Sequence, residues 1–169
     1  MFLKDVIEFH RKFGIEGGNY GNTVVRNLLP DEIRFRLGFL FEEFAETAKA
    51  SGLKINKDIL ELFVNEIKNS EVDTLNYDGL EVIDGLLDLV YVALGTLDLK
   101  ELSETQIRSH WTEIQRANMS KERSTGANDA RSKRKHSLDI VKPDGWKGPD
   151  HNSIMDKAVK NSLRKESDE

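Results

Sequence analysis

The chain has 169 residues, no cysteine, 33% charged residues and a formal net charge of −5. This length fits one domain with a real hydrophobic core. The absence of cysteine excludes disulfide scaffolds, thiolate zinc sites and cysteine nucleophiles, and the acidic balance argues against nucleic-acid binding by the whole surface. Charged residues at Lys4, Asp5 and Glu8 interrupt the N-terminal apolar pattern, so we expect no signal peptide. The most apolar run, Val82–Leu97, is interrupted by Asp84 and Asp88, so we expect no membrane span. The lack of cysteine fits a cytoplasmic protein, which we expect.

Apolar residues recur at helical spacing along most of the chain, and its three prolines leave the middle free for long helices. We therefore predict an all-α fold, a bundle of four to five helices followed by a short irregular or β-hairpin C-terminal extension. The predicted helices are Phe2–Phe13, Asp31–Ala50, Asn56–Asn69, Asp78–Leu97 and Ser103–Ala117.

Residue types at the ends of these segments support the helix boundaries. Asp31 follows Pro30 and is expected to cap the second helix, which Ser51-Gly52 should end. Ser103 is a residue type favoured at a helix N-cap. The three glycines in Gly14–Gly21 predict a loop between the first two helices.

The composition changes after Met119, where a basic, serine-rich stretch, Lys121–His136, begins. We interpret this stretch as a mobile loop, with contact to a triphosphate or a nucleic acid as the alternatives. We accordingly divide the chain into a helical domain at 1–120 and an extension at 121–169 that packs on that domain or closes over it. The extension is predicted to contain a small strand, a turn and a short helix or frayed tail, at Leu138–Val141, Pro143–Trp146 and Asp150–Glu169.

Carboxylates occur on the most apolar predicted helix, Asp78–Leu97. A helix that is apolar nearly all round is normally buried. At 100° per residue its Glu81, Asp84 and Asp88 fall within about 60° of one another, on one stripe. Acids on a buried helix are costly unless they are paired or bind a metal.

A second acidic stripe, formed by Glu42, Glu43 and Glu46, lies on the predicted helix Asp31–Ala50. By itself it resembles an ordinary solvated face. Phe35 and Phe39 project on the same side, however, so we expect that side to face protein.

Together the two stripes would bring four or more carboxylates between helices, and Mg²⁺ is usually held by a few carboxylates and the phosphates of a substrate. The alternative is that these acids form salt bridges. The basic residues considered for such pairing are Arg26, Arg34, Arg36 and Lys49.

The segments Glu42–Glu46 and Asp84–Tyr91 resemble the MazG-like and phosphoribosyl-ATP pyrophosphohydrolase superfamily, which has E-x-x-E on one helix and E-x-x-D on a later one. This resemblance implies an all-α MazG-like bundle that uses Mg²⁺, or Mn²⁺ as a substitute. It further implies cleavage of a nucleoside triphosphate between its α and β phosphates, and a homodimer or homotetramer.

More of the chain resembles a branch of this superfamily found in bacteria and phages, over residues from about 6 to 150. The segments that carry this likeness are His10–Gly14, Asp88–Thr96, Arg116–Lys121, Val141–Pro143, Trp146 and Pro149-Asp150.

Two features depart from the superfamily pattern. Gly85 stands where the second motif has glutamate, so the role of that glutamate is carried to Asp84, with Glu81 as its rival. The two motifs are also further apart than usual, and Asn56–Asn69 supplies an additional helix between them, which would help to shape the nucleotide pocket.

The resemblance assigns roles to individual residues. The expected metal ligands are Glu43, Glu46, Asp84 and Asp88, and the general base is Glu42 or Glu43. The expected substrate-binding residues are Asn118, Lys121, Lys142, Arg116 and Trp146. Structural alternatives remain for three of them: a solvated lysine at Lys121, a helix C-cap at Asn118 and a buried tail anchor, rather than a base-stacking ring, at Trp146.

The predicted function is Mg²⁺-dependent hydrolysis of a (deoxy)nucleoside triphosphate to the monophosphate and pyrophosphate, in nucleotide-pool house-cleaning. One alternative is a non-catalytic nucleotide-binding or helical interaction protein that retains the fold. A nucleic-acid-binding helical domain using the basic segment is a third, which the net charge and the absence of a clustered aromatic platform disfavour. No membrane association is expected.

Overall fold

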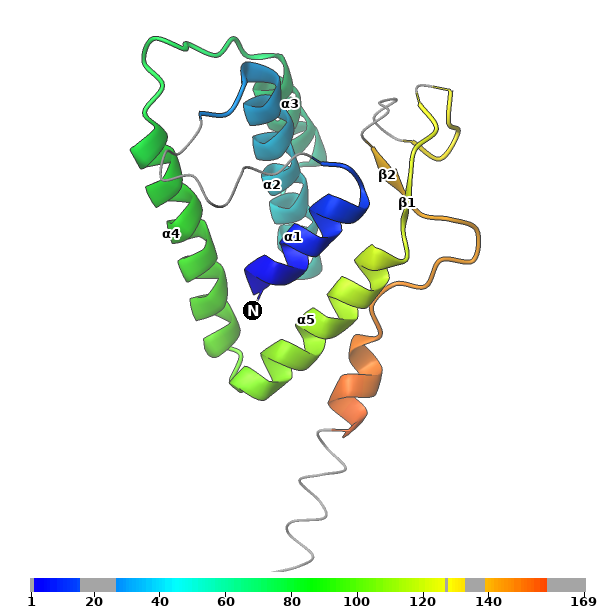
Figure 1. Cartoon of the computed structure of the whole chain (residues 1–169). Helices are drawn as coiled ribbons and strands as arrows, with labels where there is room; N and C mark the ends of the chain where they lie inside the picture. The colour runs from blue at the N-terminus through cyan, green and yellow to red at the C-terminus, as the bar shows by residue number, and fades with distance from the viewer. Residues whose placement is uncertain (1, 16–26, 127, 133–138, 158–169) are drawn as a thin grey trace, which may run out of the picture. The chain divides into compact units, whose positions relative to one another are not determined.

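The computed structural model describes residues 2–15, 27–126, 128–132 and 139–157, which are mostly helical with one small sheet in the C-terminal part (Figure 1). This arrangement confirms the predicted helical class and its short β-hairpin. Most of the predicted loop Gly14–Gly21 lies outside the described residues. The elements are α1 (Phe2–Lys12), α2 (Pro30–Ala50), α3 (Lys57–Asn69), α4 (Gly79–Asp98), α5 (Glu104–Met119), β1 (Glu122–Arg123), β2 (Ile140–Val141) and a further short helix at 151–157.

Contacts between Cα atoms group the chain into two compact units. One unit comprises Met1–Tyr20 and Leu89–Glu169, and the other comprises Gly21–Asp88. Neither unit begins or ends at residue 120, and the domain boundary predicted there stays a prediction.

The helix termini follow local chemistry, with one correction. The N-cap of α2 is Leu29 rather than Asp31, because Pro30 occupies the first helical position, where its missing N–H costs nothing. The Glu32 carboxylate accepts a hydrogen bond from the Leu29 backbone N–H at 2.8 Å. At the other end, Ser51 is the C-cap and Gly52 takes a φ of +79°, as the Ser-Gly pair predicted.

Ser103 caps α5 as predicted. Its hydroxyl accepts a hydrogen bond from the Gln106 backbone N–H at 3.3 Å, and the Gln106 side chain accepts one from the Ser103 backbone N–H at 2.9 Å. This reciprocal pair satisfies two N–H groups at the start of the helix that have no partner within it.

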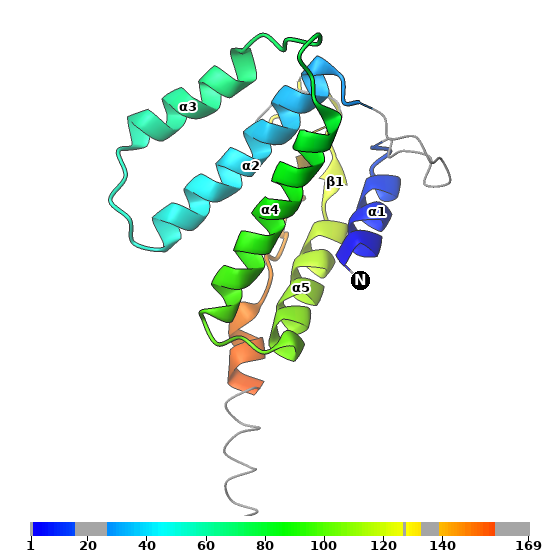
Figure 2. The ribbon, with the colours of Figure 1, turned by 90° about the vertical axis from the view of Figure 1, so that its left-hand side faces the viewer.

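In the unit Gly21–Asp88, α2 and α3 pack side by side as a helical hairpin (Figure 2). Phe41 and Phe63 meet edge to face, with ring centroids 4.7 Å apart. The Lys68 side chain crosses α2 at Gly38, where an added Cβ would lie 3.2 Å from the lysine chain. A glycine at this position therefore lets the lysine reach across the helix.

In the other unit, α1 packs against α5. The Phe2 and Trp111 rings lie 4.4 Å apart, and the Trp111 indole N–H donates to the Asp5 carboxylate at 2.6 Å. Phe13 at the end of α1 and Ala117 on α5 are buried. Trp111 therefore serves packing between α1 and α5, with its ring half-buried.

The two strands pair antiparallel, with Glu122 opposite Val141. Beyond them, the Ser124 backbone N–H donates to the Asp139 carbonyl at 2.8 Å, and the Ser132 hydroxyl donates to the Asp139 carboxylate at 2.9 Å. The described part of the basic stretch is thus held by a strand pair and by buried polar contacts. Residues 133–136 of that stretch lie outside the described residues.

The burial of α4 is the main fold prediction that is wrong. None of its residues is buried in this chain, and the Leu87 and Tyr91 side chains are 64% and 79% exposed. An apolar surface all round a helix indicates that the helix is covered, but it does not say by which chain. A large apolar surface on α4 is consequently left to water in a single copy.

Among the described residues, no helix is both long and apolar enough to span a membrane.

Candidate functional site

The two predicted metal ligands on α2, Glu43 and Glu46, lie one helical turn apart and are exposed. No described residue forms an ion pair or a hydrogen bond with either carboxylate. Arg34, a partner considered for these acids, instead pairs with Asp31 and donates to the Ser70 carbonyl at 3.0 Å. The two carboxylates therefore project into solvent without a counter-charge from the described chain.

Glu42 differs from its neighbour Glu43. Its Oε1 accepts a hydrogen bond from the Lys68 ammonium at 2.7 Å, across the α2–α3 hairpin. The sequence left the general base open between these two glutamates. The ion pair gives Glu42 a structural role, and Glu43 is the one whose carboxylate is available.

The two predicted ligands on α4, Asp84 and Asp88, are also exposed and lie one turn apart on one face. Glu81, the rival of Asp84, is exposed in the first turn of the helix. None of these three carboxylates pairs with a described cation. The residue types and their spacing agree with the sequence analysis. The carboxylates are exposed, however, so the cost of burying them, which suggested a bound metal, does not arise in one copy.

The structure does not gather these acids into a finished metal centre. Among the described residues there is no group of three or more histidine, aspartate or glutamate side chains placed to hold a metal ion. The donors are carboxylate oxygens, which suit Mg²⁺. The donor chemistry therefore fits the ion, whereas the described chain by itself does not complete the coordination.

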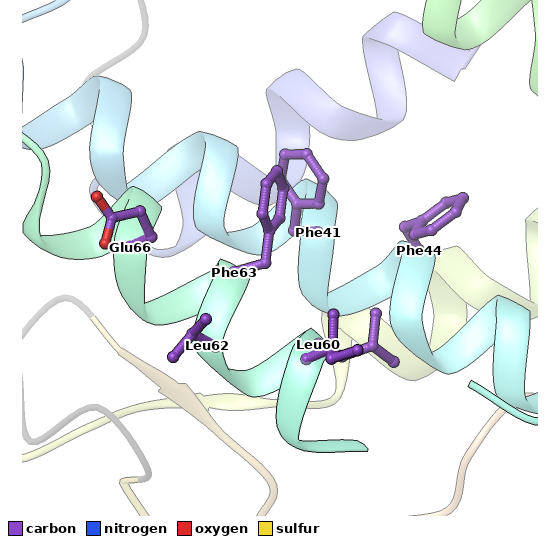
Figure 3. Close-up of a pocket in the computed structure, with 7 residues that line it drawn as sticks. Phe41, Phe44, Leu60, Leu62, Phe63 and Glu66 are labelled. Atoms are coloured by element: carbon purple, nitrogen blue, oxygen red, sulfur yellow. The ribbon is translucent and has the colours of Figure 1, made fainter. Parts of the chain in front are cut away.

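A shallow groove of about 410 Å³ lies between α2 and α3 (Figure 3). Phe63 of α3 points toward Phe41 of α2, and Glu66 supplies its acidic group. The additional helix predicted between the two motifs is α3, and it forms this groove with α2. Neither Glu43 nor Glu46 lines the groove. The lining residues are Phe41, Phe44, Ile59, Leu60, Leu62, Phe63 and Glu66.

Three predicted substrate-binding residues meet in the C-terminal part of the chain. The ammonium groups of Lys121 and Lys142 lie over the Trp146 ring, 5.6 Å and 4.5 Å from its centroid. The Trp146 indole N–H donates to the Ala117 carbonyl at 2.9 Å, and the ring is half-buried. The structure therefore brings together Lys121, Lys142 and Trp146, which we call the lysine–tryptophan cluster.

The other two predicted binding residues lie on α5. Arg116 donates to the Gly148 carbonyl at 2.8 Å and to the Glu113 carboxylate at 2.9 Å. Asn118 is half-buried in the last turn, and Ser120 is the C-cap, so the C-cap interpretation of Asn118 is wrong. Contact of either residue with a substrate stays a prediction.

Sequence reasoning missed a row of contacts that fastens residues 146–151, the C-terminal arm, along α5. The Asp150 backbone N–H donates to the Glu113 carboxylate at 3.2 Å, and the Nδ1 atoms of His110 and His151 are 2.9 Å apart. Burial, together with the positive charge of His151, lowers the pKa of His110. The partners are 37 and 41 positions apart, so no local spacing could reveal them.

Lys12 was missed for the same reason. Its ammonium donates to the Met119 carbonyl, and to the Lys121 carbonyl at 3.5 Å, at the C-terminal end of α5. Basic residues are favoured at this end of a helix because its last carbonyls carry partial negative charge. The position of Lys12 in the last turn of α1 does not reveal that it donates hydrogen bonds at the end of α5.

The comparisons with known proteins rest on one finding. Searches of curated proteins and of solved structures give no match. A family model described as phosphoribosyl-ATP pyrophosphohydrolase matches residues 6–118, more than half of the chain. This range contains the acids of α2 and α4 and ends before Lys121. Members of the family are pyrophosphohydrolases that act on nucleotides and generally use Mg²⁺, and the chain belongs to the phosphoribosyl-ATP pyrophosphohydrolase family of the MazG-like superfamily.

Proposed function

We propose that this protein hydrolyses a (deoxy)nucleoside triphosphate to the monophosphate and pyrophosphate with Mg²⁺, in nucleotide-pool house-cleaning. The observation that carries the proposal is the set of four exposed carboxylates at Glu43, Glu46, Asp84 and Asp88. No described cation neutralises them, and their chain belongs to a pyrophosphohydrolase family. Exposed carboxylates without a counter-charge from the chain are suitable oxygen ligands for a divalent cation.

The chemistry divides between the cation and the chain. A bound Mg²⁺ neutralises phosphate charge and makes bound water more acidic. A water oxygen forms a bond to the α phosphorus, the bond from that phosphorus to the bridging oxygen breaks, and pyrophosphate leaves. The proton of the attacking water goes to a carboxylate. Glu43 is the better candidate for this role, because Lys68 occupies the carboxylate of Glu42.

The proposal includes assembly as a homodimer or homotetramer. The apolar side chains of α4, including Leu87 and Tyr91, are exposed in one copy. Association of these faces would remove that surface from water, which is the main driving force of obligate assembly. Asp84 and Asp88 lie on the same helix, so assembly would also change the surroundings of the proposed metal ligands.

Substrate phosphates would be held by cationic groups outside the acidic stripes. Lys121 and Lys142 are the first choices, because they come together in the lysine–tryptophan cluster. Arg116 and Asn118 stay secondary proposals, since Arg116 already fastens the C-terminal arm.

The experiment that tests the proposed function is product analysis on the purified chain. A panel of ribo- and deoxyribonucleoside triphosphates and phosphoribosyl-ATP is incubated with Mg²⁺ or Mn²⁺, and monophosphate and pyrophosphate are measured separately from orthophosphate. We expect equal amounts of monophosphate and pyrophosphate. Absence of turnover on every compound, with an active control enzyme in the same assay, would contradict the proposal for these substrates.

Nucleotide binding without hydrolysis is the second candidate function, because Gly85 replaces the glutamate of the second motif. A rise in melting temperature with nucleotides and Mg²⁺, in the absence of any product, would favour it. Product formation together with such a rise would favour the enzyme.

A further inference from the structure

We propose that the lysine–tryptophan cluster is a binding subsite for a diphosphate group and that Trp146 acts as its positioning residue rather than as a platform for a base. The inference deepens the proposed function, on which it rests for the identity of the ligand. The cluster lies beyond residues 6–118, the part of the chain that the family model covers.

The register of the small sheet places the two lysines together. Glu122 pairs with Val141 in the antiparallel strands. Lys121 and Lys142 are the next residues outward on the two chains, so they leave the same end of the sheet side by side. Two residues 21 positions apart in the sequence thus deliver two ammonium groups to one place.

Trp146 is fixed at two points. Its backbone N–H closes a turn by donating to the Pro143 carbonyl at 3.0 Å, and Gly145 supplies the φ of +71° that the turn needs. Its indole N–H donates to the carbonyl of Ala117, a residue that is 1% exposed. The ring cannot turn without breaking this bond to a packed part of α5, so it offers the lysines a fixed surface.

The contact of the ring with the lysines argues against base stacking. The Lys142 ammonium lies over the ring at 4.5 Å from its centroid, in the range of a cation–π interaction. A nucleobase would have to displace this ammonium to use the face that it covers. The ring therefore holds the Lys142 ammonium in place, and a phosphate would contact that ammonium rather than the ring.

The electrostatics around the cluster favour an anion. The C-terminal end of α5 would repel one, but hydrogen bonds from Trp146, Lys12 and Ser120 cover its carbonyls. Among the described residues, no carboxylate pairs with the Lys142 ammonium. The Lys121 and Lys142 ammonium groups lie over one ring, and a diphosphate presents two charged groups to them.

The test is direct binding of inorganic pyrophosphate to the full chain by calorimetry, at low salt and with EDTA so that no metal contributes. We expect Lys121→Ala and Lys142→Ala each to weaken binding about tenfold, the effect of losing one charged hydrogen bond. Lys147→Ala changes an exposed neighbour whose ammonium is not one of the two over the ring. It is the matched control and should bind as the wild type does.

The positioning role is tested by two variants of Trp146. Trp146→Leu should weaken pyrophosphate binding about five- to tenfold, because the lysines lose the ring that orders them. Trp146→Phe keeps a ring and should restore most of the affinity. In turnover assays, Trp146→Leu should raise KM with little change in kcat. The circular dichroism spectrum checks that each variant is folded.

Several outcomes would overturn the inference. Unchanged pyrophosphate binding in both lysine variants would remove the subsite. Weaker binding in the lysine variants but not in Trp146→Leu would remove the positioning role. If Trp146→Leu weakened the binding of an uncharged nucleoside as much as that of pyrophosphate, the ring would be a base platform. Pyrophosphate binding that depends on the cluster, in a protein without turnover, would support the subsite and contradict the proposed function.

Discussion

The unit that contains α5 and the unit that contains α2 differ in the hydrogen-bond and ion-pair partners of their polar side chains. Along α5, polar partners come from distant parts of the same chain: Asp5 from α1, Trp146 and His151 from the C-terminal arm. In the described part of the unit Gly21–Asp88, an ion pair between Lys68 and Glu42 joins α2 to α3. The carboxylates proposed as metal ligands there have no described partner.

This contrast separates what the chain completes alone from what needs something else. Polar atoms around α5 are bonded within the chain, as buried polar groups usually are. The proposed metal ligands on α2 and α4 have no described partner, and the apolar side chains Leu87 and Tyr91 of α4 are exposed in one copy. Unneutralised acids call for a cation, and an uncovered apolar helix calls for another protein surface. The proposed chemistry therefore belongs to the region that is incomplete by itself.

The largest effect should follow from removing a carboxylate of the incomplete region. We expect Asp88→Asn or Glu46→Gln to lower kcat/KM by ~10³-fold, within the range of losing a group used in acid–base or metal-assisted catalysis. Asp98→Asn, at the end of the same α4, is the matched control and should keep wild-type activity. Initial rates of pyrophosphate release decide this, and an Asp88→Asn protein with full activity would exclude Asp88 from the site.

The next effect concerns the apolar face of α4. Leu87→Lys places a charge on a side chain that is 64% exposed in one copy and that assembly would cover. Burying a leucine contributes roughly 1.5–3 kcal/mol, and it does so in both copies of a symmetric contact. We expect the dissociation constant of the oligomer to rise at least tenfold in sedimentation velocity experiments.

The control for this variant is Leu75→Lys in the connector between α3 and α4, where the leucine is 95% exposed. This change should leave assembly intact. A wild-type protein that sediments as a monomer at every accessible concentration would refute the proposed role of the α4 face.

A smaller effect is expected from removing a buried hydrogen bond in the unit that contains α5. Ser132 is 2% exposed, and its hydroxyl donates to the buried Asp139 carboxylate at 2.9 Å. Ser132→Ala removes that donor, and we expect the free energy of unfolding in urea to fall by about 1–3 kcal/mol. Thr112→Ala, which removes an exposed helix hydroxyl that donates to the Arg108 carbonyl, should change it by a few tenths only. Equal effects of the two changes would argue against a tightly satisfied interior.

The smallest effect is a pH response of the C-terminal arm. The pKa of His110 is lowered by burial and by the charge of His151, so the docked arm disfavours the protonation of His110. Docking is unaffected above about pH 6.5, the ordinary histidine pKa, and weakens as the pH falls below it. The pKa values of the nearby Glu113 and Asp150 are lowered by hydrogen bonds, so both stay ionised in this range.

The measurement is the indole N–H signal of Trp146 in a two-dimensional NMR spectrum between pH 7.5 and pH 5.5. Trp111, which bonds to Asp5 outside the arm, serves as the internal reference. We expect the Trp146 signal to shift and the Trp111 signal to stay in place. His110→Gln should abolish the response, because it removes the group whose pKa is lowered, and a shift that persists in this variant would assign it to another group.

The sequence by itself determined the helices and the family. The helix bounds, the Ser103 cap and the Ser51-Gly52 end follow from local periodicity and capping, because helical hydrogen bonds join residues only four positions apart. The acidic motifs carried the resemblance that the family model confirms. The lysines and the tryptophan of the C-terminal part could be nominated in the same way, but their meeting could not.

The tertiary structure alone decided which distant residues meet. It showed that α4 is uncovered in one copy, that Lys68 occupies Glu42, and that Lys121 and Lys142 share the Trp146 ring. Such contacts depend on how the chain folds back over tens of residues, which periodicity does not encode. An apolar or acidic pattern states that a residue needs a partner, and only the folded chain shows whether that partner lies within it.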